Sequence, residues 1–90
     1  MTSDMRKRLI RIFITRYYLS ESNPSQSPTW NEICSSVGVE RRGGVGVKFG
    51  EYVVPEGFVD IPDPSPKVPY GRLRMTEETA MKILALEVIP

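Results

Sequence analysis

Basic side chains are the most informative residues of this chain for chemistry, because arginine and lysine pair with phosphate and carboxylate groups. Residues 6 to 48 hold eight of them against three carboxylates, a charge of +5, whereas residues 51 to 66 hold four carboxylates and no base. The net charge of the chain is only +1, so it is not suited to bind polyanions by bulk charge. The uneven placement favours a basic face turned toward phosphate groups, and the alternative is a solvated surface with uneven charge.

Residues that could catalyse a reaction are scarce. The chain has no histidine, and its single cysteine, Cys34, has no activating partner in the sequence, so both an imidazole base and an activated thiol are missing. The same shortage excludes a zinc site. Asp60 and Asp63 lie among prolines, where surface charges on a loop are expected. The glycine-rich run at residues 43–46 lacks the spacing of a phosphate-binding loop. The sequence predicts no enzyme, no cofactor and no metal.

A basic amphipathic helix is predicted from residue 3 to about residue 19, with Ser3 as its cap and Asp4 in its first turn. Its apolar stripe consists of Met5, Leu9, Ile12, Phe13 and Tyr17, and its opposite face carries Lys7, Arg8, Arg11 and Thr15. Aromatic rings beside cations are suited to stack on bases, but this spacing places Tyr17 in the core and Tyr18 on the surface. The polar residues 20–28 that follow favour packing into a globular domain over binding to a membrane surface.

A second helix is predicted at residues 29–37. Thr29 and Glu32 have the spacing of a capping box, and Gly38 is suited to end the helix in the left-handed conformation. One face of this helix is apolar, formed by Trp30, Ile33, Cys34 and Val37. Such a capped helix is typical of the second helix of a helix-turn-helix, and a core helix without a ligand is the alternative.

The second half of the chain mixes strand and helix patterns. Residues 43–54 match both a strand and a helix, although four glycines disfavour the helix. Short strands are predicted at residues 58–61 and 70–75, joined by a proline-rich loop into a wing, with Leu73 and Met75 on one face and Arg72 and Arg74 on the other. Thr76 caps a C-terminal helix at residues 77–87 whose broad apolar surface either covers the sheet or forms a homodimer.

This order of elements resembles the winged-helix DNA-binding domain at the N-terminus of the LexA repressors, over residues 5 to 76. The matching segments are RLIRIFITRYYLSE for the opening helix, SPTWNEICSSVGV for the family's Pro-Thr-x-x-Glu-Ile helix, and EGFVDI with YGRLRMT for the wing strands. The recognition helix would correspond to GGVGVKFGEYVV, which lacks the polar base-reading residues of such helices. The resemblance implies that this helix enters the major groove. It also implies DNA contacts by Thr29, Arg41, Arg42, Lys48, Arg72 and Arg74.

The sequence thus predicts one α+β domain over residues 1–90. Its core at 3–76 is a winged helix-turn-helix with three helices and a small antiparallel β wing, and an added C-terminal helix follows at 77–87.

The predicted function is binding of duplex DNA by a small cytoplasmic transcriptional regulator. The alternative is a non-enzymatic accessory or inhibitor module of the kind bacteriophages encode, which binds a protein partner instead. The near-neutral charge and the stiff stretch IPDPSPKVPY favour this alternative. No run of 18 apolar residues is present, so no membrane partner is expected.

Overall fold

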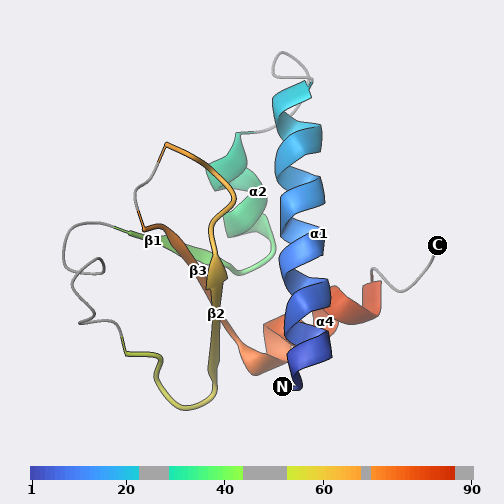
Figure 1. Ribbon diagram of the computed structural model, residues 1–90, viewed down its shortest axis with the longest axis vertical. Coiled ribbons are helices and arrows are strands. Elements are labelled where there is room, and N and C mark those ends of the chain that lie inside the picture. The colour runs from blue at the N-terminus through green and yellow to red at the C-terminus, as the bar shows by residue number, and fades with distance from the viewer. Residues whose placement is uncertain (23–28, 44–52, 68–69, 87–90) are drawn as a thin grey trace.

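Three helices and a three-stranded antiparallel sheet make up the part of the chain that the computed structural model describes, residues 1–22, 29–43, 53–67 and 70–86 (Figure 1). In chain order the elements are α1 (Ser3–Ser22), α2 (Trp30–Ser36), β1 (Glu40–Arg42), β2 (Phe58–Pro62), β3 (Arg72–Thr76) and α4 (Glu77–Leu86). The helices lie on one side of the sheet, and α1 follows the long axis of the molecule. The α+β class predicted from the sequence is confirmed.

The long helix α1 begins at a threonine cap. The backbone N–H of Met5 donates to Thr2 Oγ1 over 3.2 Å, so the cap is Thr2 and the prediction of Ser3 is wrong. The hydroxyl of Thr2 reaches the third helical residue, which leaves Ser3 free to take helical backbone angles. The helix extends to Ser22 and buries one side chain per turn along its inner face, namely Leu9, Phe13, Tyr17 and Ser20.

The second helix, α2, forms where the sequence predicts it. Thr29 has extended backbone angles, and its side chain accepts the backbone N–H of Glu32 over 3.2 Å. Gly38 has a φ of +80°, and the backbone N–H groups of Gly38 and Val39 satisfy the carbonyls at the end of the helix. The capped start and the glycine stop of this helix are therefore confirmed.

The sheet has the strand order β1-β3-β2, with β3 in the centre. Strands β2 and β3 confirm the two short strands predicted at residues 58–61 and 70–75, and they pair antiparallel with Asp60 opposite Arg74. Leu73 and Met75 of β3 are buried, whereas Arg72 and Arg74 lie on the other face. The alternation of side chains along a strand explains this pattern.

The strand β1 was not predicted. The resemblance places Arg41 and Arg42 beside the start of a recognition helix, but both have extended backbone that pairs with β3, with Arg41 opposite Leu73 and Arg42 opposite Arg72. The central strand needs backbone hydrogen-bond partners on both edges, and this segment supplies the second edge. The segment predicted as the recognition helix spans residues 43–54. Residues 44–52 of this segment, including Lys48, lie outside the described residues.

The C-terminal helix α4 closes the core. Thr76 Oγ1 accepts the backbone N–H of Thr79 over 3.1 Å, which confirms the predicted cap. Met81 and Leu86 remain exposed. Side chains from all three helices and the inner face of the sheet form one core, which consists of Leu9, Phe13, Tyr17, Trp30, Cys34, Val39, Val59, Ile61, Leu73, Met75, Ala80, Ile83 and Leu84. None of the described helices is long and apolar enough to cross a membrane.

Candidate nucleic-acid interface

Arg41, one of the predicted DNA contacts, belongs to a buried network around Asp63. Asp63 Oδ2 accepts a hydrogen bond of 2.8 Å from Arg41 Nε. Asp63 Oδ1 accepts from Trp30 Nε1 and from the backbone N–H of Ser65, both over 3.0 Å. The side chain of Asp63 is 1% exposed and that of Arg41 is 20% exposed. The guanidinium of Arg41 also donates to Asn31 Oδ1 on α2. Arg41 therefore joins α2, β1 and the segment after β2, and most of its side chain is removed from solvent.

The buried thiol of Cys34 lies close enough to this network to respond to its charges. Burial raises the pKa of Cys34 from its ordinary value of 9.0 to about 11, and the negative charge of Asp63 adds to the rise. The folded protein thus favours the protonated thiol, which is the unreactive form of a cysteine.

This pKa shift predicts a loss of stability at alkaline pH. Because the pKa is raised on folding, the stabilisation is complete below pH 9.0 and is lost as the pH rises toward about 11. The rise in the pKa of Cys34 corresponds to about 3 kcal/mol in the free energy of unfolding. We expect urea midpoints to fall more steeply over this range for the wild type than for a Cys34→Ala variant. If the urea midpoints of the two proteins fall equally with pH, the raised pKa of Cys34 is contradicted.

Arg74, predicted as a wing contact, is paired with Asp60 on the neighbouring strand. Arg74 Nε donates to Asp60 Oδ1 over 3.0 Å and Arg74 Nη2 donates to Asp60 Oδ2 over 3.2 Å, so the pair is bidentate. Arg74 Nη2 also donates to the carbonyl of Val53 over 2.9 Å. The hydrogen bond to Asp60 raises the pKa of Arg74 above its ordinary value. The exposed fractions of the two side chains are 11% and 4%, so this arginine too stabilises the fold.

The prediction that Asp60 and Asp63 are surface charges on a loop is wrong. Strand β2 includes Asp60, and both carboxylates are almost fully removed from solvent. Carboxylates this deeply buried need charged or hydrogen-bonding partners, and the two arginines supply them. Asp60 and Asp63 therefore add almost no negative charge to the surface.

The outer face of the sheet brings three of the predicted contacts together. Arg42 lies opposite Arg72 and Glu40 lies opposite Arg74, and residues directly opposite in a sheet share a face. Arg42 Nη1 donates to Glu40 Oε1 over 3.2 Å. With Asp60 on the same face, three arginines stand beside two carboxylates, which leaves this face with little excess charge.

Thr29, the remaining predicted contact within the described residues, has an exposed side chain. Its hydroxyl already accepts the Glu32 N–H as the cap of α2. A hydroxyl in this role retains one hydrogen to donate, so Thr29 can still contact a phosphate at the start of α2.

The largest unopposed positive charge in the described part of the chain lies on α1. Residues 5–20 hold five cations and no carboxylate. Among them Lys7, Arg8 and Arg11 are exposed, and their side chains form no ion pair or hydrogen bond with the described residues. We call the exposed side of this helix the α1 basic face, formed by Lys7, Arg8, Arg11, Thr15 and Tyr18.

The other two cations of α1 point away from this face. Arg6 donates to the backbone oxygen of Asp60 on β2, and Arg16 lies 5.9 Å from the ring centroid of Phe13. The amphipathic pattern of residues 3–19 predicts this basic face, but none of the predicted DNA contacts lies on it. The signal that marks it is the absence of any carboxylate over residues 5–20.

No protein-family model, curated protein or solved structure matches this chain. The resemblance to the LexA domain therefore rests on the sequence pattern alone. The evidence for the function of this chain is the distribution of charged and exposed side chains over its surface.

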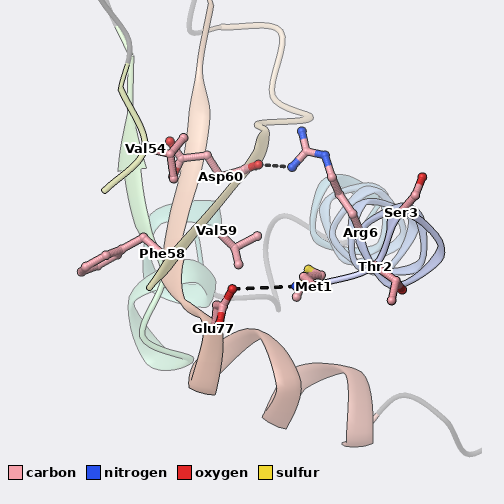
Figure 2. A pocket seen from close by; sticks show the side chains of 9 residues that line it. All are labelled: Met1, Thr2, Ser3, Arg6, Val54, Phe58, Val59, Asp60 and Glu77. Atoms are coloured by element: carbon pink, nitrogen blue, oxygen red, sulfur yellow. Dashed lines mark hydrogen bonds and ion pairs between the residues drawn. The ribbon is translucent and has the colours of Figure 1, made fainter. Parts of the chain in front are cut away.

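An open pocket of about 360 Å³ lies between the start of α1 and β2 (Figure 2). Arg6 spans one end of it to the backbone of Asp60, and the amino group of Met1 lies 3.8 Å from Glu77 Oε1 at the other end. Because charges of both signs face the pocket, it has no clear preference for an anion or a cation. The described residues also contain no group of three or more potential metal ligands. The pocket is therefore a weaker candidate site than the α1 basic face.

Proposed function

We propose that this chain is a non-enzymatic nucleic-acid-binding module whose α1 basic face contacts phosphates. The observation that carries the proposal is the exposure of Lys7, Arg8 and Arg11 without a carboxylate partner among the described residues. On the outer sheet face, by contrast, the arginines are accompanied by Glu40 and Asp60. A polyanion is attracted to the region where positive charge is not already compensated, and that region is α1.

The spacing of the cations supports this role. Lys7 and Arg11 are four residues apart, which places them about 6 Å apart along the helix axis and on the same side of it. Each strand of a duplex presents one phosphate per roughly 3.4 Å of axis. Long, flexible side chains that start one helical turn apart are suited to contact separate phosphates of one backbone.

The proposal extends to the finer fold and to the ligand. A winged helix-turn-helix is supported by the capped helix α2, by the turn at Gly38 and by the antiparallel pair β2 and β3. In this proposal the ligand is duplex DNA and the protein is a small cytoplasmic transcriptional regulator. Arg72 on the outer sheet face then provides an auxiliary phosphate contact.

Removal of charge from the α1 basic face is expected to weaken binding to a random-sequence DNA duplex. In a Lys7→Gln/Arg8→Gln/Arg11→Gln variant, the loss of three phosphate contacts lowers the slope of log K against log salt concentration by about 3. We expect at least a tenfold loss of affinity at 50 mM salt, measured by fluorescence anisotropy between 50 and 200 mM.

A charge-matched control separates local contacts from net charge. The variant Arg42→Gln/Lys67→Gln/Lys82→Gln removes the same charge from exposed positions on β1, on the turn after β2 and on α4. Its affinity is expected to fall much less. Equal losses in the two variants would show that α1 is not the contact surface, and a wild type that binds no duplex at the lower salt concentration would remove the proposal.

A protein partner is the second candidate ligand, because apolar side chains are also exposed. On α1 these are Ile14, Tyr18 and Leu19, with exposed fractions of 38%, 67% and 62%. On α4, Met81 and Leu86 are suited to the homodimer through residues 77–87. If the wild type binds no DNA duplex at 50 mM salt, this accessory or inhibitor role is favoured.

A further inference from the structure

The exposed ring of Tyr18 continues the line of cations along α1. Tyr18 follows Arg11 by seven residues and Lys7 by eleven, which are close to two and three turns of an α-helix. The three side chains therefore start from the same side of the helix, with Tyr18 about 10 Å beyond Arg11 along the axis. The side chain of Tyr18 is 67% exposed, so most of its surface is open to a ligand that already contacts the two cations.

The Tyr18 ring contacts the buried aromatic residues of the core through Tyr17. Its centroid lies 6.0 Å from that of Tyr17, with the two ring planes inclined by 62°. Tyr17 is itself buried and packs edge-on against Trp30, with centroids 5.4 Å apart. An exposed ring that is supported in this way loses little side-chain freedom when a second ring stacks on it.

We propose that the α1 basic face binds single-stranded nucleic acid in addition to the duplex, with phosphates on Lys7 and Arg11 and an unpaired base stacked on Tyr18. This inference rests on the proposed function, since the phosphate contacts are shared by both. The ring adds a preference, because the bases of a duplex are stacked on each other and closed to it, whereas those of a single strand are accessible. Cations that follow the backbone beside aromatic rings that receive bases are the usual means of binding single strands.

The test compares a fluorescent oligothymidylate with a random-sequence duplex of the same length, titrated by anisotropy at 50 mM salt. We expect wild-type protein to bind the single strand more tightly than the duplex. A Tyr18→Leu variant keeps the apolar bulk but lacks the aromatic face, so we expect at least a fivefold loss of affinity for the single strand, in line with about 1–3 kcal/mol per stacked base. Its affinity for the duplex is expected to change less than twofold.

A second exposed tyrosine supplies the control. Tyr70 is 59% exposed and precedes β3, so a Tyr70→Leu variant removes a ring outside the α1 basic face and should bind the single strand as wild type does. Thermal unfolding of both variants checks that they are folded.

The possible outcomes separate the two proposals. Equal affinity of wild type and Tyr18→Leu for the single strand would overturn the stacking role, and equal losses in the two leucine variants would also do so. In either case the phosphate contacts stand if the triple glutamine variant of α1 still binds more weakly than its charge-matched control. Loss of that difference would overturn both proposals.

Discussion

An Asp63→Ala variant is expected to lose about 3–5 kcal/mol of its free energy of unfolding, because removal of one partner leaves the other charge buried without compensation. The Asp63 side chain is 1% exposed and accepts hydrogen bonds from Arg41, Trp30 and Ser65. Water cannot replace all three contacts unless the segment after β2 separates from α2 and β1. A loss of this size is a large fraction of the stability of a small domain.

Trp30 provides the measurement, since it is the only tryptophan in the chain and its ring N–H donates to Asp63. Urea unfolding followed by tryptophan fluorescence reports both the stability and the local environment. An Asp63→Asn variant serves as the matched control, because its amide retains one acceptor oxygen but not the charge. We expect it to lose less stability than Asp63→Ala. A loss below about 1 kcal/mol for the alanine variant, typical of an exposed ion pair, would show that the network contributes little.

The parts of the fold that were predicted correctly are those whose signals are local. Helix α2 has its cap and its glycine stop within ten residues, at Thr29 and Gly38. The pair β2 and β3 follows from alternation of side chains within each strand, which places Leu73 and Met75 inside. Such signals depend on backbone geometry over one or two turns, so a single sequence is sufficient to find them.

The parts that could not be predicted depend on contacts between distant residues. Arg41 and Trp30 are 22 and 33 residues from Asp63, and no periodicity connects such positions. Strand β1 has three residues, too few to show an alternating pattern. Its conformation is fixed by the open edge of β3, which exists only when the sheet has formed.

The dependence on contacts between distant residues also explains why the candidate site could not be predicted from the sequence. Sequence alone treats every arginine as a possible phosphate contact, whereas in the fold Arg41 and Arg74 are neutralised by buried carboxylates. The cations that remain on the surface of α1, such as Arg11, are those without a carboxylate within the same helix segment. Charge counted along the sequence therefore gives the total correctly but not the surface on which it is exposed.

An Arg74→Met variant is expected to lose about 3–5 kcal/mol of its free energy of unfolding, because it leaves the carboxylate of Asp60 buried without a cation. The pair is bidentate, with exposed fractions of 11% and 4%. An Arg74→Met/Asp60→Leu double variant removes both charges together, so we expect it to recover most of this loss. Chemical unfolding of the wild type, both single variants and the double variant gives the coupling free energy directly.

This double variant also separates a structural role of Arg74 from a DNA contact. If Arg74 acts only within the fold, the folded double variant binds a DNA duplex within twofold of the wild type, since Lys7, Arg8 and Arg11 on α1 are unchanged. A wing contact predicts a different result, because loss of a phosphate contact lowers the salt slope by about 0.9. If the double variant regains its stability but binds DNA with a smaller slope of log K against log salt concentration, Arg74 contacts DNA. The buried bidentate geometry of its pair with Asp60 argues for the first result.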